Sequence, residues 1–389
     1  MANGFFFLAS LGWNFGLGMT WLAVPLYAAA QGLSNAQIGV LLAAPVFVQV
    51  PLNLAGGVYT DRIGGRRIVL ASCLMMALAS LWLMVAHGFW MLLVGQVAFV
   101  VSRAAFWPAT WAMASELPGS RGVQFGRLNA VTNFGTIAGT TLCGVLLATT
   151  GFAGTFATLA GIALVSFLAG VGTTASAPKP QTAHPHPFAA YGPLLRRPII
   201  HYSILCAYVS ALPFSLAISF YPLLLANYGY GEESSGVLLA LRALGSIGAG
   251  LVAGRFVKTG PETPWPVFCS IAVALAIGFL PAWNHPAPLA FWMLLVGLGS
   301  GAMTLYFQMT IAEASRTEER GSALALGGLG WSISHFTTPL ALGFIADRFG
   351  MAAGFYALGA VGLACAVAIA LLRRWAFTET IARPAVMPP

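Results

Sequence analysis

Residues 57–67 read Gly57-Val58-Tyr59-Thr60-Asp61-Arg62-Ile63-Gly64-Gly65-Arg66-Arg67, a short charged segment that carries three glycines. It separates two long apolar stretches, at about 35–59 and 67–86. Each stretch is long enough to form a helix across the hydrocarbon core of a bilayer, which takes about 20 apolar residues. The segment is therefore predicted to be a tight basic loop between two membrane-spanning helices.

The composition of the whole chain supports the same interpretation. Of the 389 residues, 58% are hydrophobic and 7% are charged, and the mean hydropathy is +0.83. About a quarter of the residues of a soluble domain are charged, so this composition excludes a soluble globular protein. The apolar runs are unbroken, whereas the strands of a membrane barrel alternate between apolar and polar residues. The sequence therefore predicts an all-α membrane protein.

Hydropathy and turn residues predict twelve transmembrane helices in two sets of six. The predicted spans lie near 5–30, 35–59, 67–86, 90–115, 127–150, 154–175, 199–228, 234–257, 266–283, 288–314, 322–346 and 351–373. The first span has no basic segment before it, so we expect it to stay in the protein and not to be removed as a signal peptide.

A polar, proline-rich segment at 176–198 separates the two sets and is too polar to cross a bilayer. We expect it to be a cytoplasmic linker. The predicted domains are an N-terminal six-helix bundle at 1–175, the linker at 176–198, a C-terminal six-helix bundle at 199–375 and a cytoplasmic tail at 376–389.

The basic residues predict the orientation, because cytoplasmic loops are enriched in Lys and Arg. Fifteen of the 18 basic residues fall on one side of the predicted topology. Arg348 falls on the other side, and Arg103 and Arg242 lie within spans. We therefore predict a multi-pass protein of the cytoplasmic (inner) membrane with both termini in the cytoplasm. The net charge of +8 follows from this topology and gives no indication of nucleic-acid binding.

The two sets of spans also repeat each other in sequence. The pentapeptide Gly-Val-Leu-Leu-Ala at 39–43 recurs 197 residues later, at 236–240. Arg121-Gly122 and Gly144 recur 199 residues later as Arg320-Gly321 and Gly343. Such a duplication predicts two pseudo-symmetric six-helix bundles with a cavity between them, which is a transporter architecture.

The segment 57–67 resembles the loop signature of the major facilitator superfamily, G-x-x-x-D-R-x-G-[RK]-[RK], with one extra residue before the paired arginines. Arg103 resembles the arginine of the fourth-helix motif of this family. The segment 135–144 resembles the fifth-helix glycine motif of antiporters, although Thr140 and Cys143 depart from it. The resemblance implies a secondary transporter that works by alternating access.

The resemblance also implies a latch near the cytoplasmic ends of the helices. Its ion pairs would form in one access state and break in the other, and Gly57 would let two helices approach closely. The candidate residues are Gly57, Asp61, Arg62, Arg66, Arg67, Glu116, Arg121, Glu313 and Arg320. The alternative is a set of solvated loop charges.

Two arginines are predicted at membrane depth, Arg103 in the fourth span and Arg242 in the eighth, and none of the 10 acidic residues is expected there. A charge at bilayer depth costs at least ~2.5–3.5 kcal/mol on insertion scales, so such residues usually face a cavity. We therefore predict that both arginines bind a carboxylate or phosphate group of the substrate. A structural role at a helix crossing is the alternative for Arg103.

Other candidates for the substrate site share helix faces with these residues. Trp107 and Trp111 follow Arg103 on one face of the fourth span, and Trp331 and His335 share a face of the eleventh. Further polar candidates are Asn14, Gln49, Asn133, Tyr306 and Gln308. For the aromatic residues, packing between helices is the alternative.

Energy coupling has one candidate residue in the sequence. His335 is the residue at that depth whose side chain ordinarily titrates near neutral pH, so it is the predicted proton carrier. Exchange of one anion for another, or facilitated diffusion, needs no titrating residue.

The sequence holds no nucleophile–base set, no metal-ligand cluster and no G-x-x-x-x-G-K-[ST] nucleotide loop. We therefore expect no enzyme activity, no cofactor and no metal. The expected function is transport of a small organic solute, preferably an organic anion. The alternatives are proton-coupled efflux of amphipathic drugs or metabolites and, in another class, a polytopic membrane enzyme. The expected partners are the substrate, a coupling proton or counter-anion, and the lipid bilayer around a monomer.

Overall fold

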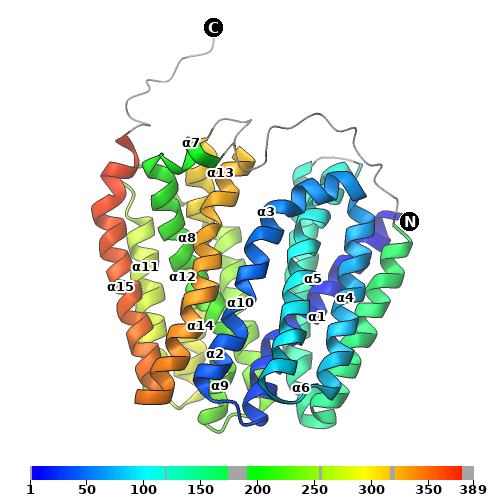
Figure 1. Cartoon of the computed structure of the whole chain (residues 1–389). Coiled ribbons are helices and arrows are strands. Elements are labelled where there is room, and N and C mark those ends of the chain that lie inside the picture. The colour runs from blue at the N-terminus through cyan, green and yellow to red at the C-terminus, as the bar shows by residue number, and fades with distance from the viewer. Residues whose placement is uncertain (1, 119–120, 174–190, 254–255, 316–319, 379–389) are drawn as a thin grey trace. The chain divides into compact units, whose positions relative to one another are not determined.

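A computed structural model of the chain describes residues 2–118, 121–173, 191–253, 256–315 and 320–378 (Figure 1). Within these ranges the regular structure is helical throughout, without a strand. The predicted all-α fold class is therefore confirmed for the part of the chain that the structure describes.

The helices of the first half match the predicted spans, with one division. They are α1 (Ala2–Ala30), α2 (Asn35–Ala43), α3 (Val46–Ile63), α4 (Gly65–Val85), α5 (Gly88–Glu116) and α6 (Arg121–Val171). The predicted span 35–59 is divided into α2 and α3 at Pro45, because proline has no N–H group to continue the helical hydrogen bonds. Helix α6 contains two predicted spans, which a turn at Gly151 (φ 66°) separates. Glycine adopts this positive φ without strain.

The second half contains the corresponding helices with two more divisions. They are α7 (Tyr191–Leu195), α8 (Pro198–Ala217), α9 (Phe220–Asn227), α10 (Glu232–Ala253), α11 (Trp265–Phe279), η1 (Leu280–Ala282), α12 (Pro286–Ala314), α13 (Arg320–Gly327), α14 (Leu329–Phe349) and α15 (Met351–Ala376). The predicted span 199–228 breaks between α8 and α9, and the span 322–346 breaks at Gly328. The short helix α7 lies within the predicted linker.

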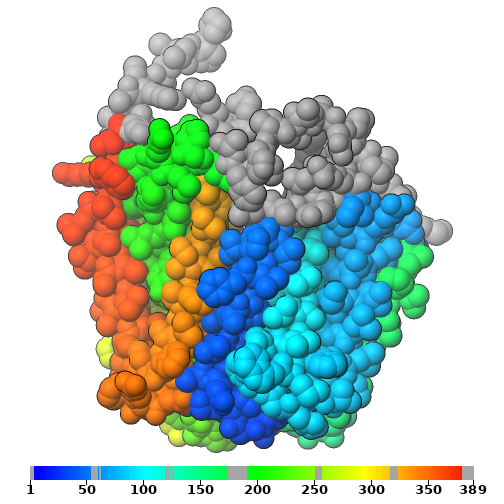
Figure 2. All heavy atoms as spheres, in the orientation of Figure 1, coloured from blue at the N-terminus to red at the C-terminus, as the bar shows by residue number. Residues whose placement is uncertain are grey.

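The surfaces of the helices match a lipid environment. Nine helical segments in the described ranges are long and apolar enough to cross a membrane. Large apolar side chains are also exposed, among them Trp90 at 75%, Phe47 at 70% and Leu371 at 75%. Figure 2 shows one face of the molecule, on which side chains of α4 and α5 form part of the surface. Exposed apolar area on this scale indicates contact with a membrane.

The chain divides into two compact units that do not follow chain order. The first unit contains Met1–Ala183, Leu216–Ala243 and Pro339–Arg348, and the second contains His184–Ser215, Leu244–Thr338 and Phe349–Pro389. The predicted halves at 1–175 and 199–375 stay a prediction from the sequence repeat.

In the first unit α1 and α6 pack backbone to backbone through glycines. A Cβ atom on Gly139 would lie 2.0 Å from the Phe15 carbonyl oxygen, and one on Gly18 would lie 2.2 Å from the Thr136 carbonyl oxygen. The Thr140 hydroxyl donates a hydrogen bond to the Gly18 carbonyl at 3.0 Å. Small residues permit this approach where lipid replaces water as the surroundings of the helices.

We predict that Gly139→Ala lowers the stability of the protein by about 1–3 kcal/mol, because the added methyl group must push α1 away from α6. The measurement is the melting temperature of the purified protein in detergent. Gly161→Ala is the control, since a Cβ atom there has no neighbour within 4 Å and the residue lies on the same helix. Equal melting temperatures for the two variants would show that the contact between α1 and α6 does not limit stability.

Candidate functional site

Arg103 lies on α5 with its side chain half buried. Its Nη2 donates a hydrogen bond to Oε1 of Gln49 on α3. Its Nε is buried and has no hydrogen-bond partner among the described residues. Among the described residues, the hydrogen-bond partner of this cation is therefore a neutral amide.

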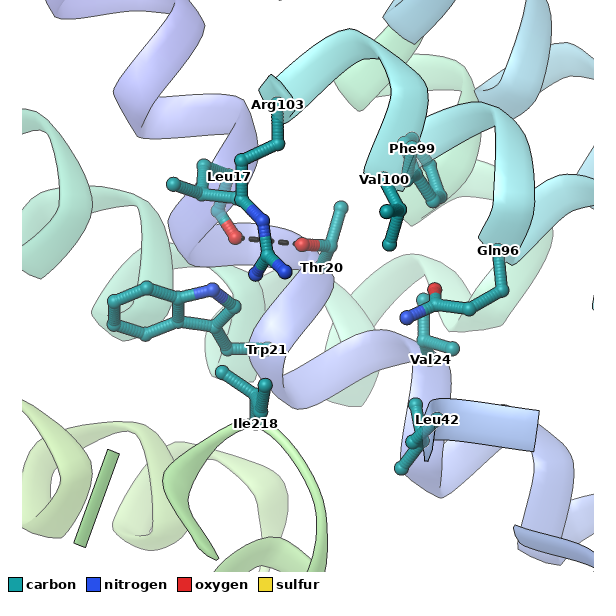
Figure 3. A pocket seen from close by; sticks show the side chains of 10 residues that line it. All are labelled: Leu17, Thr20, Trp21, Val24, Leu42, Gln96, Phe99, Val100, Arg103 and Ile218. Carbon is teal, nitrogen blue, oxygen red and sulfur yellow. Dashed lines mark hydrogen bonds between the residues drawn. The ribbon is translucent and has the colours of Figure 1, made fainter. Parts of the chain in front are cut away.

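A small cavity of about 30 Å³ opens beside this guanidinium. Figure 3 shows Arg103 pointing toward Trp21 and Thr20 of α1, with the amide of Gln96 on another side of the same space. The remaining lining is mostly apolar: Leu17, Val24, Leu42, Phe99, Val100 and Ile218. The volume suits about one water molecule. In this conformation the cavity is therefore too small to enclose an organic solute.

The tryptophans predicted to share a face with Arg103 belong to an aromatic cluster in the first unit. Trp13 stacks on Phe106 with ring centroids 3.9 Å apart, and Trp107 meets Trp13 edge-on at 6.3 Å. The ring centroids of Trp111 and Trp107 are 5.7 Å apart, and the Trp111 side chain is 50% exposed. Trp107 thus packs against Trp13 of α1, while Trp111 keeps an exposed face, and the role of both tryptophans stays a prediction.

Arg242 is the second of the two arginines predicted at membrane depth, and it also lies in the first unit. It lies on α10 with 4% of its surface exposed, and it interacts electrostatically with Tyr221 of α9, which is fully buried. No aspartate or glutamate whose side chain is described is buried. The interior of the first unit therefore contains positive charge without a buried acid among its described side chains.

His335 lies in the second unit, where α14 brings it together with Trp331 as the sequence predicts. Its Nδ1 lies 2.6 Å from the Trp331 carbonyl oxygen. Since a carbonyl oxygen only accepts, Nδ1 carries the hydrogen and donates it. The centroid of the imidazole ring lies 5.9 Å from that of the Trp331 ring and 5.3 Å from that of the Phe214 ring.

The other polar candidates belong to both units, and each is described within its own unit. Asn14 is buried and donates to the Ser10 carbonyl of its own helix at 2.9 Å, and its Oδ1 has no hydrogen-bond partner among the described residues. Asn133 is exposed and donates to the Asn129 carbonyl at 2.8 Å. In the second unit Tyr306 is buried with its hydroxyl 3.4 Å from that of Tyr202, and Gln308 is exposed.

The predicted latch falls partly outside the described residues. The side chains of Gly57, Asp61, Arg62, Arg121 and Arg320 are among those that the structure does not describe. Arg66 donates a hydrogen bond from Nη2 to the Val171 carbonyl at the end of α6.

The other latch candidates have described side chains. Glu313 accepts a hydrogen bond from the Thr259 hydroxyl. Arg67 and Glu116 are exposed. The latch therefore stays a prediction.

Of the residues that line the cavity beside Arg103, the sequence predicted only Arg103 itself, and Gln96, Thr20 and Trp21 are among those not predicted. Gln96 lies seven residues before Arg103 on α5, and this spacing places both on one helix face, so a helical wheel could have found it. Thr20 and Trp21 carry no comparable signal, because their contact with α5 depends on how α1 packs. Tyr221, beside Arg242, was missed for the same reason.

The family model of the Major Facilitator Superfamily matches residues 6–284 and 271–385 of the chain. The chain belongs to this superfamily. It is therefore a multi-pass membrane transporter and not an enzyme. The resemblance predicted from residues 57–67 is confirmed, and so is the predicted fold class.

Two relatives indicate how the family match extends along the chain. The 3-(3-hydroxy-phenyl)propionate transporter of Escherichia coli (strain K12) is 28% identical over 354 residues, which cover 84% of this chain and 83% of that one. The quinolone resistance protein NorA of Staphylococcus aureus is 25% identical over 126 residues. That match spans 32% of this chain and only 32% of the length of NorA.

Solved structures of transporters share the fold. The nucleoside transporter NupG superimposes with a TM-score of 0.79 at 11% identity, covering 97% of this chain and 100% of that one. A bacterial homolog of the human lysosomal transporter Spinster gives a TM-score of 0.71 at 17% identity, covering 97% and 92%. At these identities the likeness supports the fold alone.

We predict that Gln49→Glu stabilises the substrate-free protein by about 1 kcal/mol, because it gives Arg103 a charged partner. The measurement is the melting temperature in detergent without added solute. Gln49→Met has a similar size and no acceptor, so it should lower the melting temperature. If Gln49→Glu lowered it as much as Gln49→Met, the hydrogen bond to Arg103 would not matter for stability.

Proposed function

We propose that this transporter carries a small organic anion across the cytoplasmic membrane by alternating access. The observation that carries the proposal is Arg103, a cation inside the first unit that is bonded to the neutral amide of Gln49. A substrate carboxylate would replace this partner, because it carries the opposite charge and can accept two parallel hydrogen bonds from the guanidinium, which a neutral amide oxygen cannot do.

Arg242 supports the same substrate class. It is nearly fully buried in the first unit, where no described acidic side chain is buried. An anion that binds in the transport pathway lowers the cost of keeping these cations away from water. A cationic substrate would raise that cost.

The relative that matches over most of its length supports a carboxylate with a ring. The 3-(3-hydroxy-phenyl)propionate transporter is named for an aromatic carboxylate. In this chain Trp21 lines the cavity beside Arg103, so a cation and an aromatic face lie together. We propose aromatic carboxylates as the first compounds to test.

The oligomeric state, the membrane and the orientation of the protein are also proposed. We propose a monomer in the inner membrane with both termini in the cytoplasm, as the asymmetry of the basic residues favours. The cytoplasmic latch around Asp61 belongs to the same proposal.

We predict that Arg103→Gln and Arg242→Gln each reduce uptake of the best aromatic carboxylate by about ten- to a hundredfold, which corresponds to the loss of a charged hydrogen bond. The measurement is initial uptake of the labelled compound into proteoliposomes. The matched control is Arg348→Gln, which makes the same change at an exposed position.

Unchanged uptake in both interior variants would contradict an anion-binding role for these arginines. A loss of equal size in Arg348→Gln would contradict it as well, since the effect would then come from net charge.

Proton-coupled efflux is the second candidate function. It is favoured by the partial match to NorA and by His335, whose Nδ1–H is held by the Trp331 carbonyl. This hydrogen bond fixes the tautomer, so Nε2 is the atom to which a proton would add.

We predict that His335→Gln abolishes the dependence of transport on a pH gradient if His335 carries the proton, because glutamine does not titrate. The measurement compares transport in proteoliposomes with and without an imposed pH gradient. A pH gradient that drives His335→Gln as strongly as the wild type would assign coupling to another group.

A further inference from the structure

Helix α2 begins without an acidic residue in its first turn. The N–H groups at a helix N-terminus carry partial positive charge and need acceptors from outside the helix. A local capping box meets part of this need: Ser34 Oγ accepts from the Gln37 N–H at 3.3 Å, and Gln37 Oε1 accepts from the Ser34 N–H at 2.9 Å. The N–H groups of Asn35 and Ala36 take their acceptor from elsewhere.

Asp347, at the end of α14, supplies both acceptors. Its Oδ1 accepts from the Asn35 N–H at 2.9 Å and its Oδ2 from the Ala36 N–H at 3.0 Å. The residue lies beyond the predicted span 322–346. Burial raises the pKa of the Asp347 carboxyl, but hydrogen bonds from Ala36, Ser34 and Asn35 outweigh this effect and hold the pKa below its ordinary value. The carboxyl group is therefore ionised at neutral pH.

The same two helices touch directly through glycines, and Figure 1 shows them side by side. A Cβ atom on Gly39 of α2 would lie 2.4 Å from the Pro339 carbonyl oxygen, and one on Gly343 of α14 would lie 2.4 Å from the Asn35 carbonyl oxygen. All these residues belong to the first unit. Asp347 thus closes one end of a tight crossing between an early and a late segment of the chain.

The sequence repeat provides a second crossing for comparison, between α6 and α10. A Cβ atom on Gly144 would lie 2.3 Å from the Glu232 carbonyl oxygen, and one on Gly236 would lie 2.9 Å from the Thr140 carbonyl oxygen. These two glycines are the repeat equivalents of Gly343 and Gly39.

The acid is placed differently in the two crossings. Helix α10 has its own acids, Glu232 and Glu233, in its first turn. The position on α6 that is equivalent to Asp347 holds Ala148. Helix α10 therefore has acids of its own beside its N-terminus, whereas α2 receives its acid from α14.

We propose that Asp347 is a clasp that holds the outer ends of α2 and α14 together and must release before these helices separate. The proposal rests on alternating access in the proposed function and on the predicted topology, which places this end outside. Both hydrogen bonds exist only while the helices touch, so they stabilise the touching state selectively. Loss of the carboxylate charge shifts the population toward the separated state.

The test measures access from outside to Leu42, which is 5% exposed on α2 and lines the cavity beside Arg103. Leu42→Cys is placed in a chain whose 5 native cysteines are replaced by alanine. A membrane-impermeant maleimide is added to intact cells and the labelling rate is measured. Asp347→Asn should raise the rate about two- to fivefold, the population change that a charge at a helix end supports.

The matched control is Glu233→Gln, which removes an exposed acid from the same end of the first unit but from a helix that carries it in its own first turn. Its labelling rate should equal that of the parent chain. Asp347→Glu keeps the charge and should stay within about twofold of the parent.

A double variant separates a clasp from a simple helix cap. Asn35→Asp combined with Asp347→Asn returns an acid to the N-terminus of α2 but not the link to α14. We expect it to recover the melting temperature of the parent chain while its labelling rate stays raised.

Three outcomes would overturn the clasp. They are a parent-like labelling rate in Asp347→Asn, an equal rise in Glu233→Gln, and a parent-like rate in the double variant. None of these outcomes bears on the proposed anion transport, which is tested separately by uptake in the Arg103→Gln and Arg242→Gln variants. The labelling rate of Leu42→Cys is measured without substrate. It therefore tests the clasp even if the Arg103→Gln and Arg242→Gln variants show that the arginines do not bind an anion.

Discussion

The cost of placing a charge in hydrocarbon governs how this chain distributes its few charged residues. Only 7% of the residues are charged, and the acids with described side chains all lie at exposed or half-exposed positions. Among the basic residues with described side chains, Arg242 is buried at 4% exposure, and Arg103 is half buried in the middle of α5. A buried cation is stable only where polar groups or a visiting anion compensate it. The amide of Gln49 beside Arg103 and the Tyr221 side chain beside Arg242 provide polar groups in the first unit, and the proposed substrate completes this environment.

The absence of water from the hydrocarbon core also explains why glycines lie where helices touch. Apolar side chains gain nothing by leaving lipid for the protein interior, so helices associate through close backbone contact and hydrogen bonds. Glycines of α1 and α6 make a contact within one half of the chain, while those of α2 and α14 make one between distant segments. In the proposed alternating-access cycle, contacts of the second kind break when α2 and α14 separate. That is why the acid that closes such a crossing, Asp347, bears on the conformational equilibrium.

The sequence predicts the helices better than it predicts their contacts. Span positions follow from hydropathy, which depends on composition alone, and the separation of two spans at Gly151 was found. Breaks at Pro45 and Gly328 were missed because the residues around them are as apolar as the helices. Arg103 and Gln49 were each identified as candidates, but their hydrogen bond depends on the packing of α3 against α5. Trp21 and Thr20 were missed for the same reason, whereas the spacing of Gln96 was available in the sequence.

Asp347 and Ala36 are more than 300 positions apart in the sequence, and the residues around either of them do not predict their hydrogen bond. The sequence does contain one of its causes, which is a helix start at Asn35 without an acid in its first turn. N–H groups at a helix start that lack a local acceptor indicate that another part of the chain supplies one, but they do not indicate which residue does so. The comparison of the two halves of the chain points to Asp347 as the acceptor, because the end of α14 carries this acid whereas the equivalent position on α6 holds Ala148.

Two ligands of the same shape and different charge test whether Arg103 and Arg242 form an anion site. The melting temperature of the purified protein is measured with 3-(3-hydroxyphenyl)propionate and with its uncharged primary amide over the same concentration range. A ligand that binds only the folded state stabilises it by about 2.7 kcal/mol at a hundred times its Kd. We predict that the carboxylate raises the melting temperature with the logarithm of its concentration above its Kd and that the amide does not. Equal stabilisation by both compounds, or stabilisation by the amide alone, would contradict an anion site built around Arg103 and Arg242.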